Sequence, residues 1–165
     1  MAEQASSQGA DSASTHSMLF EIAFIHGDQA AMQREASWGA GTREEVFVLV
    51  TAANALDSIG KIKGGREARQ RAMSGATRYG MNEFASILQA VQAGRDASHG
   101  YTTLAQAEAA EALRQYSKGN MRMVAAVALA QTGDTARSRK LIDAISQDFP
   151  DDTLLHAVIL PGVGF

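Results

Sequence analysis

Four histidines and two pairs of adjacent carboxylates are the side chains best suited to metal binding or acid–base chemistry. The histidines are spread along the chain as His16, His26, His99 and His156. None has the His-Glu-x-x-His or His-x-x-Glu-His spacing of zinc ligands on one helix. Glu44–Glu45 and Asp151–Asp152 are sequence neighbours, and neighbours on a helix point in different directions. Surface, packing and helix-start roles therefore explain these residues better than a metal site or a catalytic pair.

Motifs for nucleophilic catalysis and phosphate binding are also missing. The sequence has no cysteine and no Gly-x-Ser-x-Gly element, which excludes thiol catalysis and a nucleophile elbow. Lys63-Gly-Gly-Arg66 has the glycines of a phosphate-binding loop but lacks the Gly-Lys-Ser/Thr ending. Gly64 and Gly65 are better explained by close approach of two helices, at about 1 kcal/mol each relative to alanine. We therefore expect a protein that is not an enzyme and holds no metal ion or cofactor.

One basic cluster lies between Lys61 and Arg78, where six basic side chains are opposed only by Glu67. A solvated helix face is the favoured interpretation, and a patch for an acidic partner or a nucleic acid is the alternative. The whole chain has a net charge of -3, and no aromatic residues alternate with these basic ones. No nucleic-acid partner is therefore expected.

The composition favours helices. Alanine is frequent, the chain has two prolines, and aromatic residues make up only 6% of it, so small side chains must supply much of the packing. Glycine, aspartate and asparagine separate segments with helical periodicity. The segments expected to be helical are 16–26, 29–38, 43–59, 61–79, 83–97, 101–115, two helices within 120–150, and 154–160.

Capping residues predict several helix starts. Ser14 or Thr15 is expected to cap the first helix, and Asp28 the second. Thr42-Arg-Glu-Glu45 has the form of a capping box, whose two side chains satisfy free helix N–H groups. The β-branched run that begins Val46–Leu56 is also compatible with a strand. The capping box and the alanine-rich continuation favour a buried helix.

The glycines at the turns repeat with a period near 33 residues. Gly27 and Gly60 are 33 residues apart, as are Gly100 and Gly133. The third turn is ambiguous, since Gly94 lies 34 residues after Gly60 and Gly100 lies 40 after it. Such a period is typical of a helical-repeat solenoid, in which each hairpin stacks on the next.

The last hairpin resembles the tetratricopeptide repeat. Gly133–Asp134 matches the turn of that family, Ser138 its small position in the second helix, and Pro150 its closing proline. The aromatic residue at the turn and the tryptophan of the first helix are missing. The resemblance implies an all-α, right-handed α-solenoid of about four antiparallel helix hairpins.

One helical domain is expected over residues 16–160, between a disordered N-terminal tail, 1–15, and a C-terminal tail, 161–165. The N-terminus lacks the basic start and apolar core of a secretory signal. No run of about 18 apolar residues occurs, so no membrane span is expected. A cytoplasmic protein, or a module of a larger chain, is the expectation.

A closer resemblance is to the repeat region that follows the kinase domain in some acidobacterial serine/threonine kinases and related regulators. Ala23–Trp38 is similar to the first repeat of that region, and Ala126–Arg139 with Asp148–Leu155 is similar to its last. No Gly-rich phosphate loop and no His-Arg-Asp loop occurs, so the resemblance implies a bacterial regulatory or interaction module without kinase activity. In a membrane-anchored kinase, such a module would be extracytoplasmic.

A concave groove lined by the first helix of each hairpin is the binding site that such a repeat implies. Turns at Gly27, Gly60 and Gly133 place nine side chains on it: Glu21, Phe24, Phe47, Val50, Asn54, Asp57, Met123, Val127 and Gln131. The set is mainly apolar and has no basic clamp for a terminal carboxylate, so an apolar extended or helical peptide is the expected guest. We therefore expect a protein-interaction scaffold. The alternative is a structural element that self-associates into a homo-oligomer and buries part of this face.

Overall fold

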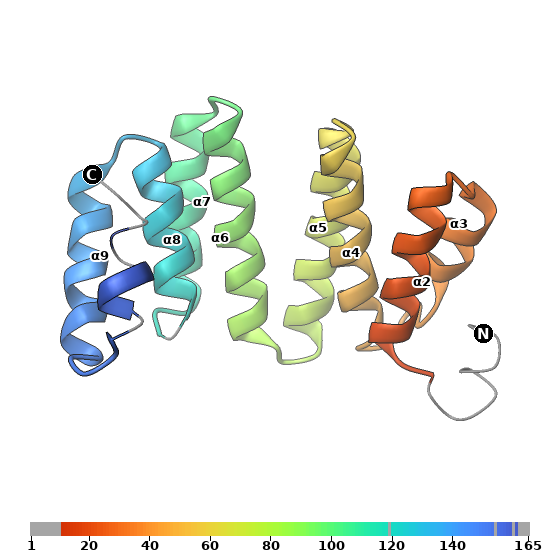
Figure 1. The fold of residues 1–165 in the computed structure, drawn as a ribbon, viewed down its shortest axis with the longest axis horizontal. Helices are drawn as coiled ribbons and strands as arrows, with labels where there is room; N and C mark the ends of the chain where they lie inside the picture. The colour runs from red at the N-terminus through yellow and green to blue at the C-terminus, as the bar shows by residue number, and fades with distance from the viewer. Residues whose placement is uncertain (1–10, 119, 154, 160, 162–165) are drawn as a thin grey trace. The chain divides into compact units, whose positions relative to one another are not determined.

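The computed structural model describes residues 11–118, 120–153, 155–159 and 161. Within these ranges the regular structure is entirely helical, with no strand (Figure 1). Val46–Leu56, for which a strand was the alternative, lies inside α4. The expected all-α class is therefore confirmed for these residues.

The helices follow one another with short turns. In chain order they are α2 (Ala13–His26), α3 (Gln29–Ser37), α4 (Glu45–Ser58), α5 (Ile62–Arg78), α6 (Asn82–Ser98), α7 (Thr102–Gln115), α8 (Asn120–Gln131) and α9 (Thr135–Asp148). A short π-helix, η1 (Leu155–Ile159), follows them. The chain divides after Met81 into two compact units. The N-terminal unit holds α2 to α5, and the C-terminal unit holds α6 to α9 and η1.

The N-terminal unit is built from two hairpins. α2 packs on α3 and α4 on α5, while α4 also contacts both α2 and α3. One of its core clusters consists of Phe20, Ala52 and Ala55, with the half-buried Phe24, Met32 and Ala36 packed against it. Because two of the three buried members are alanines, α2 and α4 approach closely.

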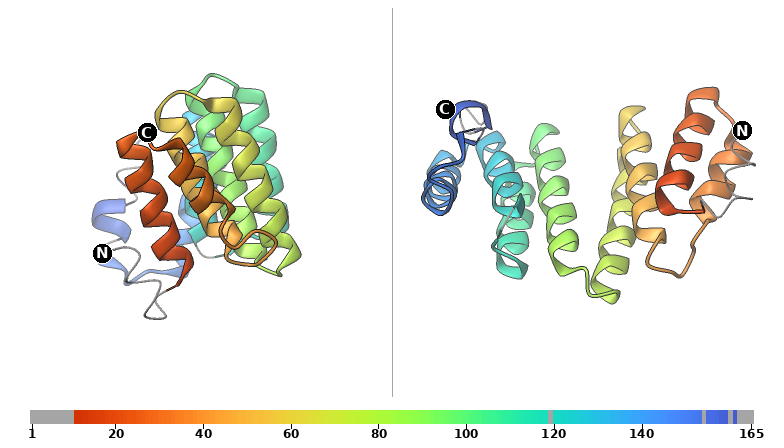
Figure 2. Two further views of the ribbon diagram at one scale, coloured as in Figure 1. Left: turned by 90° about the vertical axis from the view of Figure 1, so that its right-hand side faces the viewer. Right: turned by 60° about the horizontal axis from the view of Figure 1, so that its bottom comes forward.

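The C-terminal unit repeats this packing scheme. α6 packs on α7 and α8 on α9, and α8 also contacts both α6 and α7 (Figures 1 and 2). Two of its core clusters are rich in alanine. One comprises Ala90, Ala112, Met121 and Ala125, and the other comprises Ala93, Ala109, Ala128 and Leu129. Ser138 is fully buried and its hydroxyl donates to the carbonyl oxygen of Ala126 over 2.8 Å. The small residue at this position of the last hairpin therefore lets α9 contact α8.

The structure settles the third turn at Gly100. Gly94 lies within α6, whereas Gly100 has a φ of +83° that an L side chain rarely adopts. The N–H of Tyr101 donates to the carbonyl oxygen of Asp96 over 2.8 Å. The N–H of Asp134 donates in the same way to Leu129 after α8, and both bonds are those of a Schellman motif.

Two of the predicted helix starts are wrong in detail. Ser12, two residues before Ser14, caps α2 by accepting the Thr15 N–H over 3.2 Å, so the helix begins at Ala13. The capping box does not form, because the Thr42 hydroxyl donates to the carbonyl oxygen of Gly39 over 2.7 Å. α4 consequently begins at Glu45 and not at 43.

Other predicted caps agree with the structure. The Asp28 carboxylate accepts the Ala31 N–H over 2.9 Å and caps α3. Asp152 accepts the Leu155 N–H over 2.9 Å, and the expected final helix is the π-helical turn η1. Residues 1–10 and 162–165 of the two predicted tails lie outside the described residues, as do residues 154 and 160 at the ends of that helix.

Candidate functional site

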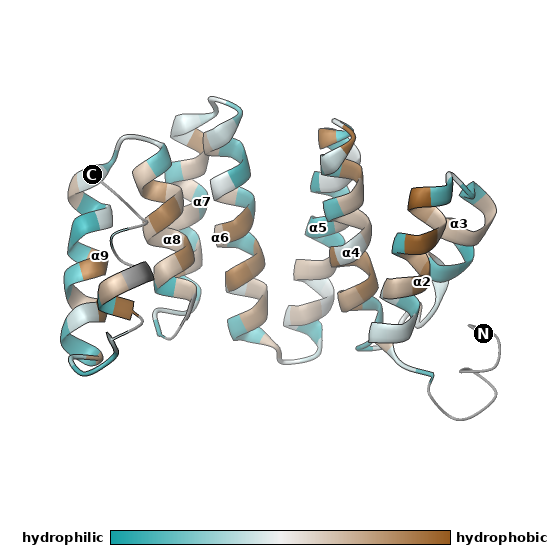
Figure 3. Cartoon of the chain, viewed as in Figure 1, coloured by the Kyte–Doolittle hydropathy of each residue, from teal (hydrophilic) through white to brown (hydrophobic). Residues whose placement is uncertain are grey.

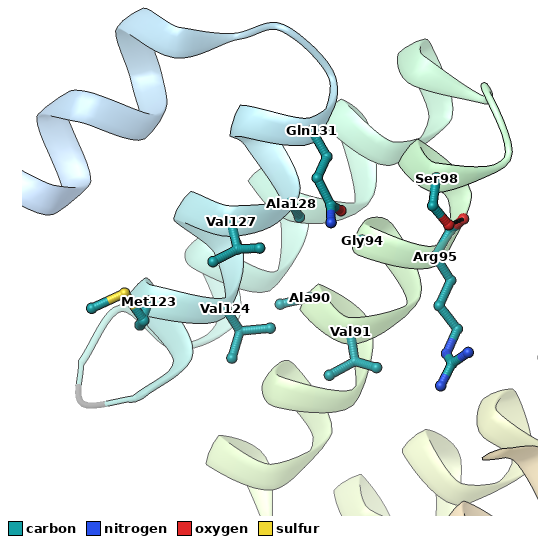
Figure 4. A pocket seen from close by; sticks show the side chains of 10 residues that line it. All are labelled: Ala90, Val91, Gly94, Arg95, Ser98, Met123, Val124, Val127, Ala128 and Gln131. Carbon is teal, nitrogen blue, oxygen red and sulfur yellow. Dashed lines mark hydrogen bonds between the residues drawn. The ribbon is translucent and has the colours of Figure 1, made fainter. Parts of the chain in front are cut away.

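An open, mainly apolar cleft lies between α6 and α8 on the C-terminal unit. Its volume is about 430 Å³. The residues that line it are Ala90, Val91, Gly94, Arg95, Ser98, Met123, Val124, Val127, Ala128 and Gln131 (Figure 4). A volume of this size is within the range of ligand-binding pockets, although the cleft is shallow and exposed to solvent.

Small residues bring the two helices together at the floor of the cleft. A Cβ atom on Gly94 would lie 3.4 Å from Gln131 Oε1 and 3.9 Å from the Ala128 Cβ atom. Ala90 is one helical turn before Gly94 and is fully buried. Because residues four apart share a helix face, Ala90 and Gly94 form a row that accepts α8 at short range.

Larger apolar side chains form the walls. Val91 stands on α6, and Met123, Val124 and Val127 stand on α8, all of them half-buried. Figure 4 shows Val124 and Val91 on facing sides of the cleft and Met123 beyond them, near one end. These side chains are held by helix backbones, which makes the apolar surface largely preformed.

Polar groups gather toward the other end of the cleft. Gln131 is exposed, and the Ser98 hydroxyl donates to the carbonyl oxygen of Arg95 over 2.7 Å. Figure 4 shows the Arg95 side chain extending from the edge of α6, away from Gln131. Arg95 is the only ionisable side chain among the lining residues. The cleft can therefore hold an apolar ligand with a polar group at one end, and it contains no acid–base pair.

Three of the nine predicted groove residues, Met123, Val127 and Gln131, come together in this cleft. Sequence reasoning missed the α6 wall, namely Val91 and Arg95, because the ambiguous third turn left the helix register undefined. The signal that was available is the pair of small residues Ala90 and Gly94, four positions apart.

The α4 candidates belong to the N-terminal unit. Phe47 is 38% exposed, Val50 is half-buried and Asn54 is exposed. The Asn54 amide oxygen accepts a hydrogen bond of 3.4 Å from Arg69 Nη2. These three residues therefore lie on an accessible part of α4.

Asp57 is engaged within the protein. Its carboxylate lies 2.6 Å from Arg69 Nη2, and the two side chains are only 4% and 1% exposed respectively. Gly65 makes room for this ion pair, because a Cβ atom there would lie 2.0 Å from Asp57 Oδ1. Gly65 therefore permits the close approach of α4 and α5, as expected. The Asp57 side chain lies in the interior of the N-terminal unit and does not face a groove.

The α2 candidates divide between surface and core. Glu21 is exposed, whereas Phe24 is half-buried and packs against the core cluster around Phe20. Phe24 therefore contributes mainly to packing between α2 and α4.

The basic segment Lys61–Arg78 is not one solvated face. Arg69 is buried against Asp57, and the guanidinium of Arg71 donates to Glu45 over 2.9 Å. The acidic partners come from α4, which the local sequence could not reveal. Two of the six basic residues, Arg69 and Arg71, therefore form ion pairs that join α5 to α4.

His16 forms a cluster with two carboxylates. Its Nδ1 lies 2.6 Å from Glu35 Oε2 and its Nε2 lies 2.6 Å from Asp11 Oδ1. The Trp38 ring stacks on the imidazole at a centroid distance of 4.0 Å. Both ring nitrogens of His16 are therefore engaged by carboxylate oxygens within this cluster.

No group of three or more His, Cys, Asp or Glu side chains that could hold a metal ion occurs within the part of the chain that the structure describes. None of the helices in those ranges is long and apolar enough to cross a membrane. Comparison of this chain with protein-family models, with curated proteins and with solved structures finds no match.

Proposed function

We propose that this protein is a non-catalytic interaction module that binds a peptide, or a segment of a partner protein, in the cleft between α6 and α8. The observation that carries the proposal is the preformed apolar surface of Val91, Met123, Val124 and Val127, with an exposed amide at one end. Exposed apolar surface on a rigid helical scaffold is a common means of binding a partner chain.

The proposal extends to a right-handed, tetratricopeptide-like solenoid. In each unit the first helix of one hairpin packs on the first helix of the next, α2 on α4 and α6 on α8. The second helix of each leading hairpin also contacts the next first helix, α3 on α4 and α7 on α8. Stacked hairpins have this nearest-neighbour pattern, which supports the repeat interpretation and, with the resemblance to kinase-associated repeats, a role as a regulatory module of a signalling protein.

The cleft favours a guest with one or two aliphatic side chains followed by a polar group. The aliphatic side chains would displace water from the surface between Val91 and Val124. A backbone or side-chain amide of the guest would pair with Gln131, whose side chain is exposed. A short helix with anchors at positions i and i+4 would fit this arrangement, as would an extended strand.

Selection from a displayed random peptide library tests the proposal. Enriched peptides are expected to carry aliphatic anchors and to bind the purified chain, measured by fluorescence anisotropy. Val127→Asp is expected to weaken that binding at least tenfold, because it places a charge on the apolar wall. Gln131→Ala, at an exposed position, is expected to weaken binding several-fold without altering the thermal unfolding temperature.

Ala136→Asp is the matched control, since it adds the same charge at an exposed position on α9 of the same unit. This variant is expected to bind the selected peptides as the unchanged protein does. The proposal fails if no peptide is enriched, or if Val127→Asp and Ala136→Asp affect binding equally.

A further inference from the structure

α2 has apolar side chains on two opposite faces. Phe20 and Ala23 are buried in the N-terminal unit, at 3% and 5% exposure. Met18, Ile22 and Ile25 are 60%, 51% and 78% exposed. Figure 3 shows apolar residues recurring along this helix, whereas α9 is largely hydrophilic. A helix that is hydrophobic all round is normally buried on both sides.

The three exposed residues form one stripe, which we call the α2 stripe. Their spacings of four and three residues keep them within about 60° of one another on a helix of 3.6 residues per turn. The stripe lies opposite Phe20 and Ala23, the side by which α2 packs on the rest of its unit. Spacings of four and three are also those of the d, a and d positions of a coiled-coil seam.

The described residues of the chain leave the stripe exposed to solvent. A continuous apolar seam on a helix is most simply covered by an equivalent seam, as in isologous dimers.

We propose that two copies of this protein associate through their α2 stripes, with the two helices parallel and side by side. Ile22 occupies the a position, and Met18 and Ile25 occupy d positions, so each side chain packs against its counterpart in the second copy. The contact is independent of the proposed peptide cleft, which lies in the C-terminal unit.

Two exposed polar side chains beside the stripe favour the parallel orientation. Glu21 lies along one edge of the stripe, at a g position, and His26 lies along the other, at an e position. In a parallel pair the g residue faces the e residue five positions later in the second helix, which places Glu21 opposite His26 of the second copy. The carboxylate can accept a hydrogen bond from the imidazole N–H, and the symmetry gives two such pairs. An antiparallel pair would not bring these two residues together.

Sedimentation equilibrium over a range of protein concentrations tests the association. The unchanged protein is expected to have twice the monomer mass at high concentration and to dissociate on dilution. Ile22→Glu is expected to have the monomer mass at every concentration. It should leave the helical circular dichroism unchanged, because the side chain already faces solvent in the single chain.

Leu104→Glu is the matched control, since Leu104 is 44% exposed on α7. This variant is expected to dimerise as the unchanged protein does. The proposal is overturned if the unchanged protein is a monomer at all concentrations, or if the two variants have the same mass as each other.

The absence of native cysteines permits a second test of the orientation. Met18→Cys and Ile25→Cys are each expected to form disulfide-linked dimers on mild oxidation, because parallel d positions bring identical residues within disulfide range. Leu104→Cys should remain unlinked. Cross-linking only in a mixture of Met18→Cys and Ile25→Cys would indicate antiparallel helices and would overturn the proposed arrangement.

Discussion

Gly64 and Gly65 are adjacent in α5, yet replacement of each by alanine is expected to have opposite effects on stability. A Cβ atom on Gly65 would lie 2.0 Å from Asp57 Oδ1 and 3.0 Å from the carbonyl oxygen of Ala53. A Cβ atom on Gly64 would lie 3.4 Å from Leu56 Cδ1, an ordinary van der Waals contact. Helix propensity alone would favour both substitutions equally.

The expected magnitudes follow from the two environments. Gly64→Ala should raise the free energy of unfolding by about 0.8–1 kcal/mol, the difference in helix propensity. In Gly65→Ala the Asp57 carboxylate has to move away from Arg69, whose side chain is only 1% exposed. Breaking a buried ion pair costs about 3–5 kcal/mol. After the propensity gain, Gly65→Ala should lower the free energy of unfolding by about 2–4 kcal/mol.

Urea unfolding followed by circular dichroism measures both variants, with Gly64→Ala as the matched control. A double-mutant cycle with Asp57→Ala isolates the contact, because removal of the carboxylate relieves the closest clash. Gly65→Ala should then add little to the loss caused by Asp57→Ala. Equal stability of Gly64→Ala and Gly65→Ala would refute this reasoning, and so would full additivity in the cycle.

Three other substitutions probe local features of the two units. His16→Phe keeps a ring in place but removes the hydrogen bond to the largely buried Glu35. The free energy of unfolding should therefore fall by about 1–3 kcal/mol, measured by tryptophan fluorescence in urea. No loss would mean that the cluster does not stabilise the unit. Ser138→Leu should destabilise the last hairpin by about 1–3 kcal/mol through overpacking. Ser138→Ala should destabilise it less, and calorimetry measures both effects. The reverse order of stability would contradict the packing of α9 on α8 described above. The backbone N–H and guanidinium of Arg137 lower the pKa of Asp134, so Asp134 stabilises the folded state above its unfolded pKa and loses that effect as the pH falls through its folded pKa. Asp134→Asn, which retains a capping oxygen, should therefore lower the unfolding temperature at pH 7 but not at a pH below the folded pKa; an equal shift at both would contradict the assignment.

Helices and turns could be predicted closely because they depend on local chemistry. The turns at Gly27, Gly60 and Gly133 all occur at the expected residues, since a positive φ after a helix favours glycine whatever the tertiary context. Two helix starts were predicted wrongly. Ser12, a neighbour of Ser14, caps α2. The Thr42 hydroxyl donates to Gly39, and α4 has no side-chain cap.

The candidate site could be predicted only in part. Met123, Val127 and Gln131 were found because their hairpin has clear ends, and their spacing of four residues places them on one face. The opposite wall, including Val91, depended on the register of α6, which the alternative turn at Gly94 had obscured. Asp57 was wrongly predicted to face the groove, because its position on the helix suggested exposure. Its carboxylate is instead buried in an ion pair with Arg69, which is distant in sequence.

By itself, the sequence determined that this chain is helical, where most helices begin and end, and that small residues mediate their contacts. Those properties follow from alanine content, glycine turns and aspartate caps, whose interactions span a few residues. Only the tertiary structure decided which face of each helix is buried. It placed Asp57 on Arg69, joined α6 and α8 around an apolar cleft, and left the α2 stripe in solvent. These outcomes depend on contacts between residues far apart in sequence. An alanine-rich sequence permits two helices to pack in several registers of similar energy, so the sequence pattern alone does not select one of them.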